Sequence, residues 1–183
     1  MVWTQISFGT VFLLLTQAVP LQLVQRVAMH TYSLSFPAGW YVQREPQNDS
    51  VYACNEKDGN CTPARGGLPK AGRITLTVMP DQNHPDHPNY DNDLDRFMRF
   101  ELKSHRHAQP ITELALHPSD SGGSSRCLLI RSLIGGDVWA DLYGWKLENK
   151  LFRAVATYND DPKQNEILRS VAIDIISSVR LRE

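Results

Sequence analysis

Histidine and carboxylate side chains gather in one short stretch of the chain. His84, Asp86 and His87 lie close together, and an acidic segment, residues 89–95, follows them. Imidazole and carboxylate groups are ligands of zinc and other divalent ions. The spacing matches no known metal cage, because a structural zinc site needs four converging ligands and the glycine of the calcium loop is absent. We therefore interpret the stretch as a solvated loop, keep His84, Asp86 and His87 as weak metal candidates, and expect no resident cofactor.

The cysteines divide into a close pair and a single residue. Cys54 and Cys61 flank Asp58 and Gly59, a turn signal that would fold the segment back and bring the two thiols together. We predict a disulfide between them, worth about 2.5 kcal/mol in the chain-entropy model. The alternative is two free thiols in a surface loop. Cys127 lies in the apolar run CLLI and is predicted to be a buried, unreactive thiol.

Motifs for nucleophilic catalysis and for nucleotide binding are missing from the sequence. There is no Gly-x-Ser-x-Gly elbow, no Walker loop and no dinucleotide fingerprint. Asp137 and Asp141 form no obvious acid/base pair unless the fold brings them together. His105 and His107 follow the last apolar turn of a predicted helix, where cations stabilise the helix dipole. These patterns favour a protein that is not an enzyme, without excluding one.

Composition and charge indicate one globular domain and exclude a general nucleic-acid binder. The chain has 183 residues, of which 42% are hydrophobic and 21% charged, and this suits a single core. We expect that domain to cover residues 29–182. The net charge is −1 and the pI about 6.6, so no basic field exists to attract phosphate backbones.

The first 25 residues carry no charged side chain, and the segment with most apolar residues is 6–19. Residues 1–20 are therefore predicted to be a cleaved signal peptide, and together with the cysteine pair they indicate a periplasmic or secreted protein. A signal peptide normally opens with Lys or Arg, which is absent here. A start elsewhere, or an uncleaved weak anchor as the chain's contact with the membrane, remains the alternative.

Apolar periodicity predicts the elements. Residues 126–158 form three apolar runs separated by turn signals, which is typical of an antiparallel meander. Strands are predicted before it near residues 31–36, 40–42, 50–54, 73–79 and 111–117. Helices are predicted near residues 94–105 and from residue 162, the second with a buried stripe. This order indicates an α+β fold, an α/β/α sandwich with a central antiparallel sheet of about six to eight strands and two main helices. The buried stripe of the second helix is expected to consist of Ile167, Leu168, Val171, Ile175 and Val179.

Bulky side chains occupy both faces of the predicted strand that contains Trp139, Tyr143 and Trp145. A sheet covered on both sides would place them in the core, which is the interpretation we favour. An open face would instead make Trp139 and Tyr143 an aromatic patch of the type found at interfaces.

Several short motifs resemble the PsbP/Mog-type superfamily. They are a strand ending Phe-Pro-Ala-Gly-Trp at residues 36–40, an Ile-Thr-Leu strand, a Gly-Gly turn, an Ala-Thr-Tyr strand end at residues 156–158 and the final helix. The similarity spans residues 31–181. It implies an α/β/α sandwich and a non-enzymatic binding or assembly role. The sequence lacks a lipobox cysteine, and the Cys54/Cys61 loop departs from the family pattern.

The function we expect is an exported, non-catalytic binding or assembly module of the bacterial cell envelope that recognises a protein partner. A chaperone or immunity protein for a secreted effector belongs to the same class. The alternative is a small periplasmic hydrolase, or a metal- or ligand-binding protein, that uses the loop around His84 and His87. A deep polar pocket near that loop would favour the alternative. The sequence leaves the partner's identity and the oligomeric state open.

Overall fold

The structure is a computed structural model, and it describes residues 22–56, 72–81, 93–116, 126–135, 138–159 and 162–182. Within these ranges the strands form two sheets, and two α-helices pack against the larger one. The elements are β1 (Leu23–Ala28), β2 (Tyr32–Pro37), β3 (Tyr41–Glu45), the 3₁₀ helix η1 (Pro46–Asn48), β4 (Ser50–Cys54), β5 (Ile74–Pro80), α1 (Leu94–Ser104), β6 (Thr112–Ala115), β7 (Arg126–Gly135), β8 (Val138–Leu147), β9 (Lys150–Asn159), α2 (Pro162–Ser177) and β10 (Arg180–Leu181).

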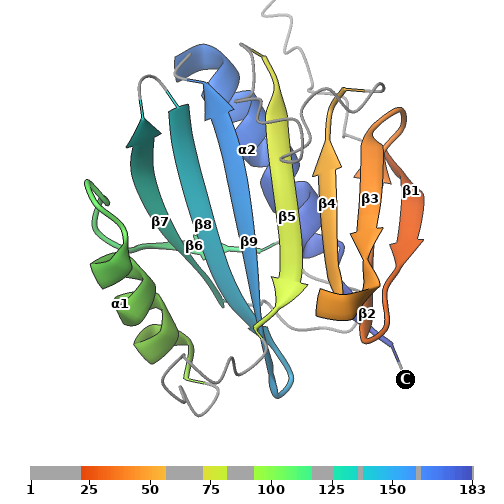
Figure 1. Ribbon diagram of the computed structural model, residues 1–183, viewed down its shortest axis with the longest axis horizontal. Coiled ribbons are helices and arrows are strands. Elements are labelled where there is room, and N and C mark those ends of the chain that lie inside the picture. Colours follow the sequence, from red (N-terminus) through yellow and green to blue (C-terminus); the bar gives the residue numbers. More distant parts are fainter. Residues whose placement is uncertain are drawn as a thin grey trace, which may run out of the picture.

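The larger sheet has seven strands in the order β3-β4-β5-β9-β8-β7-β6, and every neighbouring pair is antiparallel. The predicted meander forms its centre as β7, β8 and β9. A second sheet of order β1-β2-β10 stands beside β3 and β4 at one end of the molecule (Figure 1).

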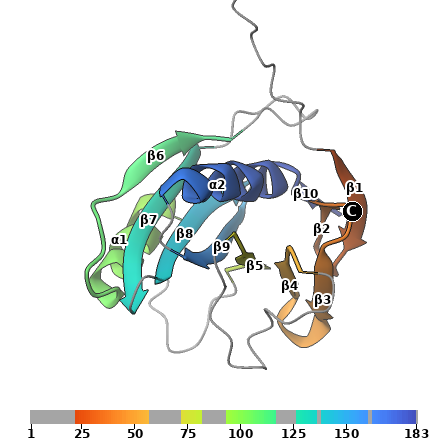
Figure 2. The same ribbon diagram turned by 90° about the horizontal axis from the view of Figure 1, so that it is seen from above.

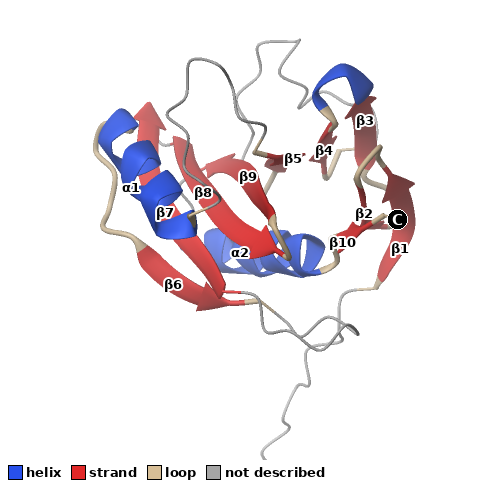
Figure 3. Ribbon diagram, turned by 90° about the horizontal axis from the view of Figure 1, so that it is seen from below, coloured by secondary structure: helices blue, strands red, loops and turns tan. Residues whose placement is uncertain are grey.

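The two helices cover opposite faces of the seven-stranded sheet. Side chains alternate along β7, so Cys127 and Leu129 join the core under α2, whereas Leu128 and Ile130 join the core under α1. Figures 2 and 3 show the strands lying between the helices. The predicted α/β/α sandwich is therefore confirmed, and seven strands fall within the predicted number.

Helix α1 packs closely on the sheet. Its N-cap is Asp93, whose carboxylate accepts a hydrogen bond from the Arg96 backbone N–H at 3.1 Å. Phe97 and Met98 are fully buried against β7 and β8. Beneath them lies Gly144, where an added Cβ would overlap the Met98 sulfur. The missing side chain at this position lets the helix approach the strand.

The buried stripe of α2 was predicted correctly at Leu168, Ile175 and Val179, but Val171 is only partly buried and Ile167 is 66% exposed. Successive residues of a helix point about 100° apart, so Leu168 and Ile167 cannot both face the sheet centrally. The helix turns Leu168 inward and leaves Ile167 in solvent. The side chains that fill the core are Leu168, Ala172, Ile175 and Ile176, with Val179 just past the helix end.

The smaller sheet contains two strands that the sequence did not predict. Strand β1 begins at Leu23, ahead of the expected domain start at residue 29, and β10 has only two residues. The sheet is tied to the rest of the fold by side-chain bonds. The Tyr32 hydroxyl donates to the Val78 carbonyl at 2.8 Å, and the Ser35 N–H donates to the Ser178 hydroxyl at 2.9 Å.

Short strands form the two edges of the larger sheet. Edge strand β3 has five residues and edge strand β6 has four, compared with ten in each strand of the meander. Exposed polar side chains lie on both edges, including Arg44 on β3 and Glu113 on β6.

Among the described residues, neither helix combines the length and apolar character needed to cross a bilayer.

Candidate functional site

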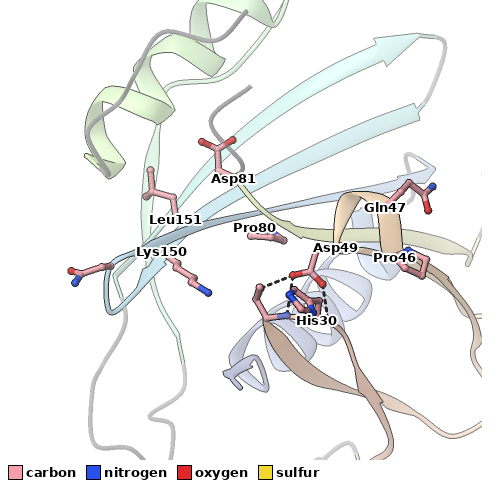
Figure 4. A pocket seen from close by; sticks show the side chains of 10 residues that line it. His30, Pro46, Gln47, Asp49, Pro80, Asp81, Lys150 and Leu151 are labelled. Carbon is pink, nitrogen blue, oxygen red and sulfur yellow. Dashed lines mark hydrogen bonds between the residues drawn. The ribbon is translucent and has the colours of Figure 1, made fainter. Parts of the chain in front are cut away.

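An open groove lies where the β1–β2 turn, η1, the end of β5 and the β8–β9 turn meet (Figure 4). We call it the turn groove. Its volume is about 390 Å³. The turn groove is lined by His30, Thr31, Pro46, Gln47, Asp49, Pro80, Asp81, Asn149, Lys150 and Leu151.

Asp49 fixes one wall of the turn groove. Its backbone is left-handed, with φ of 46°, and its side chain is 5% exposed. The carboxylate accepts hydrogen bonds from the backbone N–H groups of His30 at 2.7 Å and Thr31 at 3.1 Å, and from the Thr31 hydroxyl. Burial and then the negative charge of Asp49 raise the pKa of Tyr32, so this tyrosine stays protonated. The β1–β2 turn is thus held in one conformation.

The opposite wall comes from the seven-stranded sheet. The Asp81 N–H donates to the Leu151 carbonyl at 2.8 Å, which extends the pairing of β5 with β9 into the groove. Leu151 is buried, whereas Lys150 is exposed. Apolar Pro80 and Leu151 therefore stand next to a cation, facing the wall that Asp49 builds.

A second polar cluster is buried between the sheet and α2, around Asp141. This carboxylate is fully buried on β8. Arg131 on β7 donates to both of its oxygens, from Nε at 2.8 Å and Nη2 at 3.1 Å, and Arg169 on α2 donates from Nε at 3.2 Å. The hydroxyls of Tyr143 and Tyr158 also donate to it. The cluster links three strands, β7, β8 and β9, to α2 through one carboxylate.

Burial and the charge of Asp141 together keep the two tyrosines protonated. Desolvation is the main cause that raises the pKa of Tyr143 and Tyr158, and the negative charge of Asp141 is the next. Both hydroxyls therefore act as hydrogen-bond donors at neutral pH, and neither serves as a base.

A small hollow opens beside this cluster, and we call it the α2 hollow. Its volume is about 240 Å³. Residues from the segment before β6, from β7, β8 and β9, and from α2 converge on it. The α2 hollow is lined by Gln109, Arg131, Trp139, Tyr158, Asn165, Glu166 and Arg169.

The loop with the weak metal candidates His84, Asp86 and His87 lies outside the described residues. The turn groove includes Asp81, the last described residue before that loop. Among the described residues, no three His, Cys, Asp or Glu side chains are grouped so that they could hold a metal ion. The solvated-loop interpretation, with these residues as weak metal candidates, stays a prediction.

Of the predicted cysteine pair, Cys54 is fully buried at the end of β4, and Cys61 lies outside the described residues. Cys127 is fully buried, as predicted, and burial raises the pKa of its thiol to about 12. A thiol with so high a pKa contributes almost no thiolate at neutral pH.

We expect the number of reactive thiols, measured by titration, to show whether the predicted disulfide is present. The native protein should show no reactive thiol, because Cys127 is buried and the other two cysteines are joined. Unfolding without reductant should release one thiol per chain, and unfolding with prior reduction should release three, the number of cysteines in the chain. Three thiols in the unreduced unfolded protein would contradict the disulfide.

The aromatic strand belongs mainly to the core, as favoured from the sequence. Tyr143 and Trp145 are fully buried, and Trp139 is half-buried at the α2 hollow.

The histidines predicted at a helix end lie directly after α1. His105 is the C-cap of α1, with Nε2 3.5 Å from a Glu101 carboxylate oxygen, and His107 follows with φ of 58°. Their position after α1 agrees with a role at the helix end.

The Asp141 cluster was not predicted, although the sequence contains a signal for it. Arg131 and Asp141 are charged residues within largely apolar strands, and they are placed symmetrically about the predicted turn at Gly136. Pairing the strands about that turn puts the two residues opposite each other, which is the observed register. The third partner, Arg169, comes from α2, and no local pattern relates it to β8.

Comparison with known proteins decides the type of fold. No protein-family model and no curated protein matches the chain. A mutant Mog1 and the Saccharomyces cerevisiae Ran-binding protein Mog1p superpose on it with TM-scores of 0.52 and 0.50, at 9% and 10% sequence identity. The matches cover 86% and 84% of this chain and 95% and 96% of theirs. This chain has the Mog1 fold.

Two further structures are similar to the Mog1 fold of this chain. Cyanobacterial PsbP (CyanoP) from Synechocystis matches at 16% identity and a TM-score of 0.48, covering 92% of this chain and 99% of its own. A Bacteroides thetaiotaomicron protein matches at 14% identity and 0.49, covering 83% of this chain. This chain spans 45% of that protein's length. The two Mog1 structures confirm the predicted PsbP/Mog-type fold, as a fold.

Proposed function

We propose that this chain is a non-catalytic binding module that recognises a protein partner through the turn groove. The observation that carries the proposal is the groove itself, a fixed hollow built by two turns, η1 and the end of β5. The Mog1 fold adds support, because Mog1p is described as a Ran-binding protein. The charge-free leader and the Cys54/Cys61 pair support a place in the cell envelope, periplasmic or secreted.

The walls of the turn groove are already fixed by hydrogen bonds in the unbound protein. Asp49 locks the β1–β2 turn with three hydrogen bonds, and the Asp81 N–H anchors the other wall to Leu151. A preformed surface loses little conformational entropy on association, so more of the contact energy appears as affinity. A groove of about 390 Å³ is large enough to receive one or two side chains of a partner.

The bonding of the groove favours binding over catalysis. A hydrolytic triad would need a carboxylate that orients the imidazole ring and a base next to a nucleophile. Asp49 instead accepts from the backbone N–H of His30, and the Thr31 hydroxyl donates to the same carboxylate. The carboxylate is therefore committed to holding the turn.

A bulky substitution tests the groove. We expect Gln47→Trp to weaken partner binding at least about tenfold, because an indole on this exposed wall residue would fill the hollow. The partner would first be captured by a photo-crosslinking residue placed at position 47 and then purified for titration. The affinity of the purified pair is the measurement.

The matched control is Gln43→Trp, the same change at an exposed position on edge strand β3 outside the groove. This variant should bind like the original protein. Equal affinity of both variants would show that the partner does not use the turn groove and would overturn the proposal.

A further inference from the structure

Two residues that line the α2 hollow carry buried polar atoms that the fold leaves without partners. Four buried side-chain nitrogen or oxygen atoms lack a hydrogen-bond partner in the part of the chain that the structure describes, and two of them belong to residues that line this hollow. They are the donor Nε1 of Trp139 and the acceptor Oδ1 of Asn165. Asn165 is only 7% exposed. Native proteins rarely leave buried polar atoms unpaired, and those that remain call for a ligand or ordered water.

The α2 hollow has a positive charge at its buried side and a negative charge at its exposed rim. Arg131 and Arg169 share the single carboxylate of Asp141, so the buried cluster has a net charge of +1. Asp141 accepts from the Nε atom of Arg169, and the guanidinium also interacts with the Tyr158 side chain at the edge of the hollow. The side chain of Arg169 is 24% exposed. Glu166 adds a negative charge on the exposed rim.

These atoms define the ligand chemistry. A carboxylate can accept from the Trp139 indole N–H and from the guanidinium nitrogens, as arginine and carboxylate groups commonly pair. An N–H next to that carboxylate can donate to Asn165 Oδ1, and a positive amine would also be favoured by Glu166. Inorganic phosphate and sulfate bring the negative charge without the N–H donor. A hollow of about 240 Å³ accepts a group the size of one amino-acid residue.

We propose that the α2 hollow binds an α-carboxylate with its adjoining N–H group. A peptide C-terminus and a free amino acid both present this chemistry. The site lies between the sheet and α2 and shares no lining residue with the turn groove, so the inference goes beyond the proposed function and does not depend on it.

Nuclear magnetic resonance of the full ¹⁵N-labelled chain tests the proposal directly. The sequence has four tryptophans, and Trp139→Phe identifies which indole N–H signal belongs to Trp139. The probes are N-acetyl-L-alanine, which mimics a peptide C-terminus, L-alanine, and L-alaninamide, which lacks the carboxylate. We expect a saturable shift of the Trp139 signal with a carboxylate probe and none with L-alaninamide. Tighter binding of the acetylated probe identifies a peptide C-terminus, and tighter binding of L-alanine identifies a free amino acid.

Asn165→Leu separates a binding role from a structural one. Removing an unpaired acceptor should leave the free energy of unfolding undiminished, while the affinity for the carboxylate probe, measured by calorimetry, should fall at least about tenfold. Trp139→Phe, which keeps an aromatic ring and removes the N–H, should weaken binding in the same assay. No saturable shift with either carboxylate probe, an equal response to L-alaninamide, or unchanged affinity in both variants would show that the hollow holds only water.

Discussion

Asp141→Asn is expected to lower the free energy of unfolding by about 3 kcal/mol. The substitution removes the negative charge that pairs with the guanidinium groups of Arg131 and Arg169 inside the sandwich. Removing one partner of a buried ion pair is strongly destabilising, because the other charge stays buried without compensation. The two arginines are 22% and 24% exposed, and contact with water keeps the loss at the lower end of that effect. Equilibrium unfolding in urea gives the value.

Asp95→Asn is the matched control for this change. Asp95 pairs with Arg126 at 2.7 Å, but both side chains are close to half exposed, and Arg126 also bonds Glu113. The hydrogen bond from Arg126 lowers the pKa of Asp95, yet water screens such surface pairs. The control should lose far less stability, and added salt should reduce its loss further. Equal losses for the two variants would contradict a structural role for the Asp141 cluster.

Phe97→Ala is expected to cost about 3 to 4 kcal/mol of unfolding free energy. The Phe97 ring is fully buried under α1, in the core formed with Leu128, Ile130 and Leu142. Truncation loses the burial of an aromatic ring and leaves a cavity that the rigid meander cannot close. Urea unfolding again provides the measurement.

Phe100→Ala is the matched control on the same helix. Phe100 is only partly buried at the margin of this core, so its truncation should cost clearly less. If both variants lose the same stability, α1 does not cover the sheet as the structure shows it.

Periodicity predicted much of the fold because it records which side chains are buried. In β5, Ile74, Leu76 and Val78 are fully buried and alternate with threonines, and this pattern alone located the strand. The α1 boundaries followed from an Asp cap and the spacing of Phe97 and Met98. Such signals are local, so they are visible in a short window of sequence.

The candidate sites could be predicted much less well, because they join distant parts of the chain. Asp49 holds the turn at His30 from nineteen positions away, and Arg169 reaches Asp141 from the last helix. Aspartate tolerates a left-handed backbone better than most residues, but no local pattern shows that Asp49 adopts one at the end of η1 or that its carboxylate reaches the β1–β2 turn. Strand β10 was not predicted for a related reason, since two residues are too few to show alternation.

The short edges of the larger sheet bear on how a partner can be held. An extended peptide binds a sheet by adding a strand, and it then needs a long row of unpaired backbone groups. Strand β6 offers four residues and β3 offers five, and both carry exposed polar side chains, including charged ones, as edge strands that avoid pairing often do. Lengthening of the sheet by another chain is thus disfavoured, whether that chain is a foreign peptide or a second copy. The short edges of this sheet are thus compatible with the proposed recognition by side chains in preformed hollows.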